Sequence, residues 1–115
     1  MLPERIELEQ SGPVVTVRVR VPQVTHLQMQ EIVEDCLVRV RCHNATYVLL
    51  DLEEVQFLSS ECIGSIVMLL QELEHVRGRM ALVHCSDNIA FLFKVTRLDA
   101  VVGLFEDEKE ALASF

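Results

Sequence analysis

Hydrophobic and polar residues alternate over residues 5–9 and again over residues 14–20. In the second stretch, PVVTVRVRV, the valines Val15, Val17 and Val19 face one way and polar side chains face the other. The residues Ser11-Gly12-Pro13 between the two stretches supply turn chemistry. The pattern therefore predicts a β-hairpin with one apolar face.

After Pro22 the period of the apolar positions lengthens from two residues to between three and four, which is typical of an amphipathic helix packed on a sheet. The apolar face of this helix is formed by Met29, Ile32, Val33, Cys36, Leu37 and Val40. A second helix is expected from about residue 60 to Gly78. Its predicted core face consists of Ile63, Ile66, Val67, Leu70 and Leu73.

A nearly continuous apolar run, TYVLLDL, lies between the two helices, and such a run suits a strand that is buried on both faces. The rest of the chain predicts, in order, a strand at 80–84, a helix capped by Ser86 or Asp87 and running to about Thr96, a short strand near Leu104-Phe105, and a helix from Asp107 to Ala113. Strands that alternate with helices indicate one layered α/β domain over residues 1–115.

The composition narrows the class of partner. Half of the 115 residues are hydrophobic, so a core can form without metal or disulfide support. A formal net charge of −8 with scattered basic residues argues against nucleic acid, since phosphate binding depends on clustered Lys and Arg.

The four cysteines do not show the paired spacing of a zinc site, and we expect no metal and no cofactor. These residues are Cys36, Cys42, Cys62 and Cys85. No signal peptide is evident, and no window approaches the roughly 18–20 apolar residues that cross a bilayer. We therefore expect a cytoplasmic protein with free thiols that is not an integral membrane protein.

The stretch FLSSECIG, residues 57–64, is the strongest candidate for function. Two hydroxyls and a carboxylate stand there between an apolar strand and an apolar-periodic helix. The hydroxyls of Ser59 and Ser60 suit helix capping, phosphorylation or a polar contact with a partner, and these alternatives stay open. A catalytic serine is disfavoured, because no Gly-x-Ser-x-Gly elbow is present.

The ordered set of features from Tyr47 to Ser114 resembles the STAS family, the sulfate-transporter and anti-sigma-factor-antagonist domains. It comprises YVLLDL, the turn that opens a helix at FLSSECIG, a glycine turn, the strand MALVH, and the helix end at LDA. The resemblance implies a STAS (SpoIIAA-like) fold, with a mixed sheet of four or five strands and helices mainly on one face.

The resemblance also implies a regulatory position. Family members carry an Asp-Ser-Ser/Thr-Gly-Leu-Gly-like turn, and aligning Gly64 with its second glycine puts Glu61 where a Ser or Thr accepts phosphate from a partner kinase. Glu61 cannot accept phosphate, and its fixed charge partly imitates the modified state. Ser60 is an alternative acceptor. The matching position for a common family Asp before the first helix is Thr25.

We therefore expect a non-catalytic module that binds a protein, possible partners being an anti-sigma factor or its serine kinase. The predicted contact residues are Ser59, Ser60, Glu61, Cys62, Ser65 and Met68. One alternative keeps the fold as a STAS subunit of a membrane transport or sensory complex. Another is a small enzyme that uses Cys62 or Ser60 as nucleophile.

Binding of a nucleotide lacks the support of a glycine-rich phosphate loop. Phe91 and Val95 fall off the core face of their helix, so they form a second contact surface or lie beneath the last helix.

Overall fold

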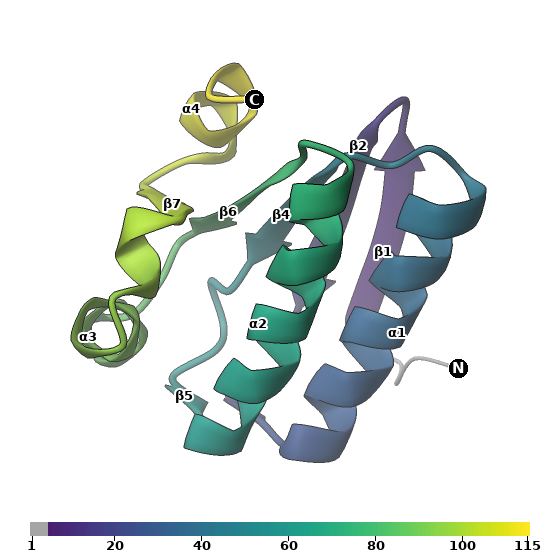
Figure 1. The fold of residues 1–115 in the computed structure, drawn as a ribbon. Helices are drawn as coiled ribbons and strands as arrows, with labels where there is room; N and C mark the ends of the chain where they lie inside the picture. The colour runs from purple at the N-terminus through teal and green to yellow at the C-terminus, as the bar shows by residue number, and fades with distance from the viewer. Residues whose placement is uncertain (1–4) are drawn as a thin grey trace.

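The centre of the protein is a five-stranded mixed sheet, seen in a computed structural model that describes residues 5–115 (Figure 1). The strand order is β1-β2-β4-β6-β7. These strands are β1 (Ile6–Ser11), β2 (Val14–Val19), β4 (Tyr47–Asp51), β6 (Arg79–Val83) and β7 (Val102–Phe105). β1 and β2 form the expected antiparallel hairpin, and the other neighbours pair in parallel. The fold-class prediction is confirmed; residues 1–4 of the expected domain lie outside the described part.

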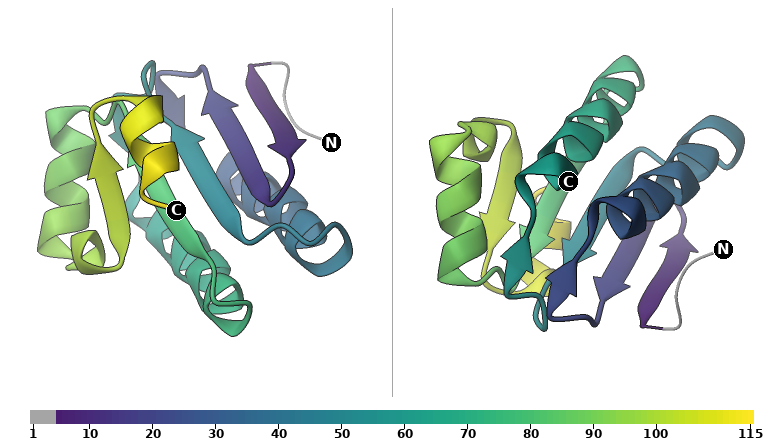
Figure 2. Two further views of the ribbon diagram at one scale, coloured as in Figure 1. Left: turned by 90° about the horizontal axis from the view of Figure 1, so that it is seen from above. Right: turned by 90° about the horizontal axis from the view of Figure 1, so that it is seen from below.

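Helices α1 (His26–Cys42) and α2 (Ser60–His75) lie side by side on one face of the sheet (Figure 1). α3 (Asp87–Val95) and the 3-10 helix η1 (Leu98–Ala100) lie at the β7 edge. The short α4 (Glu108–Ala113) crosses the opposite face, where Ala111 packs on Leu49 and Val83 (Figure 2). No helix within residues 5–115 combines the length and the apolar character that a membrane span requires.

The buried face of α1 is the predicted one, since all six of its expected core residues are buried. The buried face of α2 differs from the prediction: Ile63, Val67 and Leu70 are only partly buried. The residues that α2 buries are Cys62, Ser65, Ile66, Leu69 and Leu73. α2 packs against α1 as well as the sheet, so its buried face is rotated toward α1.

Two further strands, β3 (Gln23–Val24) and β5 (Phe57–Leu58), form a separate parallel pair. Each has two residues, which is too short to show a period in sequence. β3 immediately precedes α1, and β5 immediately precedes α2. The pair therefore holds the first turns of the two helices next to each other.

Side-chain caps define where α1, α3 and α4 begin. Thr25 and Gln28 form a reciprocal capping box at α1, with Thr25 Oγ1 accepting from the Gln28 amide at 3.1 Å. Ser86 caps α3, as the sequence indicated, and Asp107 caps α4. Thr25 thus has a structural role in this chain, of a kind that is typically worth about 1 kcal/mol.

Candidate partner-binding site

The β3–β5 pair determines which residues share the candidate site. Val24 of β3 lies opposite Leu58 of β5. Each strand leads within two residues into a helix, β3 into α1 and β5 into α2. The two starts, His26 and Ser60, are 34 positions apart in sequence. We call the surface formed by Phe57, Ser60, Glu61, Met68 and His26 the junction surface.

Glu61 lies in the first turn of α2, where the partial positive charge of the helix favours a carboxylate by roughly 0.3–1 kcal/mol. Its side chain is 72% exposed, and its Oε2 lies 3.2 Å from Nδ1 of His26 on α1. A polar contact this exposed adds little to stability. The carboxylate is therefore held in place but remains open to a partner, and the prediction of a charged helix start is confirmed.

The two serines of the junction have different surroundings. Ser59 occupies the N-cap position of α2 with extended backbone, but its side chain makes no capping hydrogen bond. Its Oγ instead lies 3.3 Å from Sγ of Cys62, three residues along the helix. Capping by the Ser59 hydroxyl is therefore not the arrangement found. Ser60, the first helical residue, is exposed.

Two of the six predicted contact residues are not on the surface. Cys62 is fully buried, and its thiol donates to the Val24 carbonyl at 3.5 Å; Ser65 is only 6% exposed. Both residues were predicted on the surface but lie on the stripe that α2 buries against the rest of the fold. A buried Cys62 also cannot meet a substrate, which removes it as a nucleophile. Met68 is 53% exposed, as expected of an outward side chain.

An apolar groove borders the junction surface. It has a volume of about 200 Å³ and lies between β5 and α3. Phe57, Phe91 and Val95 line it, with exposed fractions of 54%, 65% and 57%. The sequence left open whether α4 covers Phe91 and Val95; α4 lies on the other face of the sheet, and both residues are exposed.

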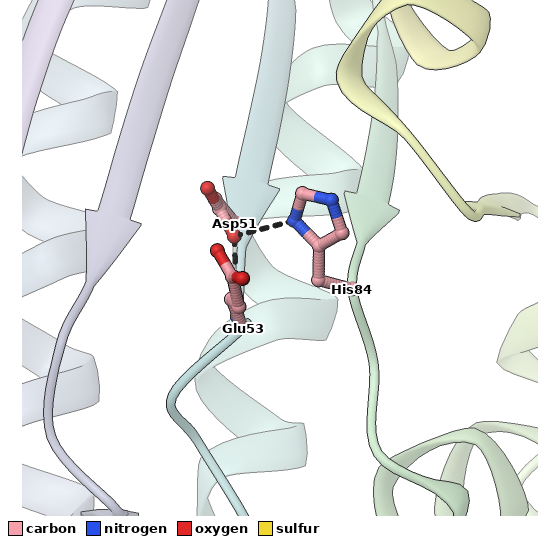
Figure 3. A group of neighbouring side chains, drawn as sticks. All are labelled: Asp51, Glu53 and His84. Atoms are coloured by element: carbon pink, nitrogen blue, oxygen red, sulfur yellow. Dashed lines mark hydrogen bonds and ion pairs between the residues drawn. The ribbon is translucent and has the colours of Figure 1, made fainter.

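A second polar cluster, Asp51, Glu53 and His84, lies at the ends of β4 and β6 (Figure 3). Asp51 Oδ1 lies 3.0 Å from His84 Nδ1 and accepts from the Glu53 amide at 3.1 Å. The hydrogen bond to Asp51 raises the pKa of His84 above its ordinary value. The side-chain atoms of Asp51, Glu53 and His84 that could bind a metal ion all lie within 4.8 Å of one another. However, Asp51 and His84 already satisfy each other.

Sequence reasoning missed this cluster because 33 positions separate Asp51 from His84. A usable signal was present, since each polar residue directly follows the apolar part of a strand in the parallel sheet. Two further thiols offer no reactive site to add: burial raises the pKa of Cys36 to about 12 and that of Cys85 to about 11. Thiols of such high pKa are poor nucleophiles at neutral pH.

Comparison with known families gives one match over nearly the whole chain. The STAS domain model matches residues 5–111. A protein of Thermotoga neapolitana, named as a candidate anti-sigma factor antagonist, is 32% identical over 65 residues. That match covers 56% of this chain and 58% of the relative, so the chain spans less than two thirds of the relative's length.

Solved structures share the fold at lower sequence identity. The phosphorylated form of the Bacillus cell fate determinant SpoIIAA superposes with a TM-score of 0.76 at 22% identity, covering 95% of this chain and 97% of that one. An anti-sigma-factor antagonist (STAS) domain protein from Planctomyces limnophilus gives 0.78 at 23% identity, covering 95% of each chain. At these identities the likeness establishes the arrangement of helices and strands.

Proposed function

Because this chain belongs to the STAS domain family, we propose that it is a non-catalytic, cytoplasmic protein-binding module of the anti-sigma factor antagonist type. The observation that carries the proposal is the exposed first turn of α2, where Ser60 and Glu61 stand between exposed apolar side chains. Phe57 flanks this turn on one side and Met68 on the other. Protein interfaces commonly combine such aromatic and Met contacts with a few charges.

Gly64 supports the use of this surface. It lies in the second turn of α2, and a Cβ added there would meet no atom within 4 Å. Gly inside a helix costs roughly 0.8–1.0 kcal/mol relative to Ala, so packing within the chain does not explain it. A glycine at this position leaves the helix flat beside Ser60 and Glu61, which suits the close approach of a partner backbone.

Two versions of the proposal differ in the fate of the phosphate switch. In the first, Glu61 replaces the phosphate acceptor and the surface is permanently charged. In the second, Ser60 is the acceptor and Glu61 is a fixed charge beside it. The geometry favours the second, because the Ser60 hydroxyl is exposed at a helix start, where a phosphate is electrostatically stabilised. Ser59 is a poorer acceptor, since its hydroxyl contacts Cys62.

Phosphate transfer distinguishes the versions. The protein would be incubated with ATP and a serine kinase of the anti-sigma factor class from the same cell, and the products analysed by mass spectrometry. The second version expects phosphate on Ser60, loss of the label in Ser60→Ala, and retention in Ser59→Ala. The first expects no label on the wild type and a label on residue 61 of Glu61→Ser.

Binding to that kinase, measured by calorimetry, tests the docking surface itself. Met68→Asp should weaken binding at least tenfold, as an added charge in an apolar contact does. Glu61→Ser should tighten binding by removing a charge. Val38→Asp is the matched control, because Val38 is 51% exposed on α1. Equal effects of Met68→Asp and Val38→Asp would contradict the proposal.

The alternative of a STAS subunit in a membrane transport or sensory complex draws support from Glu61, since a permanent charge needs no kinase. Purification of the tagged protein from its native cell separates the two. An ATPase of the histidine-kinase type among the bound proteins supports the main proposal. An ATP-binding transport subunit supports the alternative.

A further inference from the structure

A second apolar groove lies toward the opposite end of α2 from the junction surface. It has a volume of about 390 Å³ and runs between the C-terminal half of α2 and the segment that contains η1. Its apolar lining residues are Val67, Leu70, Leu73, Leu98 and Val101. We call it the α2–η1 groove.

The apolar walls of the α2–η1 groove are accessible. Val101 is 63% exposed, and Val67 and Leu70 are only partly buried. Val67 and Leu70 belong to the face that the helical pattern assigned to the core. α2 thus carries a second apolar stripe that the fold leaves open, with room for side chains of another molecule.

Basic residues concentrate around this groove although the chain carries a net charge of −8. Arg79 lines the groove; Arg77 precedes the lining residue Gly78, and Arg97 precedes Leu98. Lys94 lies in the last turn of α3. Glu74 also lines the groove and Asp99 follows Leu98, so these four basic residues outnumber the two acidic ones.

These basic residues form no internal ion pair in the described part of the chain, and the one internal side-chain contact among them is a hydrogen bond of 3.4 Å from Arg79 Nη1 to the Ser114 carbonyl. In the described part of the chain, ion pairs join other arginines to carboxylates: Arg5 to Glu54, Arg18 to Glu9 and Glu108, Arg20 to Glu7, and Arg41 to Glu72. Over residues 5–115 no such pair involves Arg77, Arg79, Lys94 or Arg97. Their charge is available to a ligand.

The backbone at two of these arginines is unusual. Arg77 and Arg97 adopt positive φ angles of 57° and 62°, a region that glycine occupies at much lower cost. The fold therefore tolerates, at both positions, a long basic side chain where glycine is the easier choice. This provides variants that remove the charge without straining the backbone.

We propose that the α2–η1 groove binds an acidic amphipathic segment of a partner protein, with apolar side chains in the groove and Asp or Glu side chains against the basic rim. The charge of the rim, opposite in sign to that of the chain as a whole, selects this occupant. α2 spans Ser60–His75, and at 1.5 Å per residue it is about 24 Å long. Glu61 in the first turn and Glu74 at the far end of the groove are therefore about 20 Å apart along the helix axis.

Selection from a displayed library of random 12-residue peptides tests the proposal. The wild-type chain is the target, and clones that also bind Val101→Asp are removed. The remaining clones should be rich in Leu, Ile and Phe together with Asp and Glu, and poor in Lys and Arg. They should bind Val38→Asp, which changes a comparably exposed valine on α1, as tightly as the wild type.

The double variant Arg77→Gly/Arg97→Gly then tests the charge. It should fold normally and bind the selected peptides about tenfold more weakly, the effect of losing two exposed ion pairs. Lys109→Gly, in the exposed part of α4, should leave the affinity unchanged. A library that yields no clones sensitive to Val101→Asp, clones without acidic residues, or full affinity in the double variant would overturn the proposal. Self-association abolished by Val101→Asp would mean that a second copy occupies the groove instead.

Discussion

At the scale of single residues, short contacts decide what each polar group can do. Glu61 and His26 meet across two helix starts, and both side chains keep substantial exposure. Ser59 is turned toward a thiol, whereas its neighbour Ser60 is open. The two adjacent serines therefore differ in what they can do: the Ser59 hydroxyl is engaged by Cys62, whereas the Ser60 hydroxyl is available to another molecule.

The serine contacts lead to a stability prediction. Thr25→Ala removes a capping hydrogen bond and should lower the free energy of unfolding by about 1 kcal/mol. Ser59→Ala removes no capping bond, so its effect should stay within about 0.5 kcal/mol. Urea unfolding of both variants measures the difference. Equal losses would show that Ser59 caps α2 in solution.

The Asp51–His84 pair leads to a prediction on pH. Hydrogen bonding to Asp51 raises the pKa of His84, so the folded state holds this proton more tightly than the unfolded state. The resulting stabilisation is complete below the ordinary pKa of about 6.5 and is lost as the pH rises through the folded-state pKa. His84→Asn suits the positive φ of 59° and removes the titration.

Denaturant titrations across that pH range should therefore show the wild type losing stability, whereas His84→Asn stays flatter. The exposed His75 serves as the control: His75→Asn should retain the wild-type slope. Parallel profiles for the wild type and His84→Asn would mean that the pair does not form in solution.

At the scale of elements, α2 contributes residues to both candidate binding surfaces as well as to the core. Its buried stripe packs on α1 and the sheet, its first turn forms the junction surface, and its remaining apolar stripe lines the α2–η1 groove. Gly78 lies in the turn that follows α2. A larger residue does not fit there, because its Cβ would clash with the Thr46 carbonyl oxygen. Gly64 has no comparable restraint.

The contrast between the glycines gives a prediction for α2. Gly64→Ala should raise the free energy of unfolding by about 1 kcal/mol, which corresponds to a Tm increase of ~4 °C for a domain of this size. If the proposed junction surface is the contact surface, the same substitution should weaken binding of the proposed partner kinase, because it adds a methyl group there. Thermal unfolding and calorimetry together measure both effects. A variant that is more stable and binds as well as the wild type would place Gly64 outside the interface.

At the scale of the whole molecule, the sequence predicts the fold almost completely. Long elements with a clear period, such as β2 and α1, appear where the pattern puts them. The two-residue β3 and β5 carry no period, and their pairing depends on contacts between distant segments. The arrangement of layers is therefore readable from the chain, but the element that assembles the site is not.

The site was predicted less completely than the fold. Exposed Ser60, Glu61 and Met68 are where a helical wheel places them, whereas Cys62 and Ser65 are buried. A wheel gives the relative positions of residues on a helix but not the direction of its neighbours. For α2 the decisive neighbour is α1, because packing against it buries residues that the wheel leaves on the exposed side of α2.

The pairing of β3 with β5 bears on how specificity would be transferred between such proteins. A chimera that receives only residues 57–68 of a donor would keep a mismatched segment 23–26, because β3 and the start of α1 contact residues 57–61 through the β3–β5 pairing and through His26 and Glu61. Grafting a new recognition preference thus requires exchanging two separate stretches of the gene together.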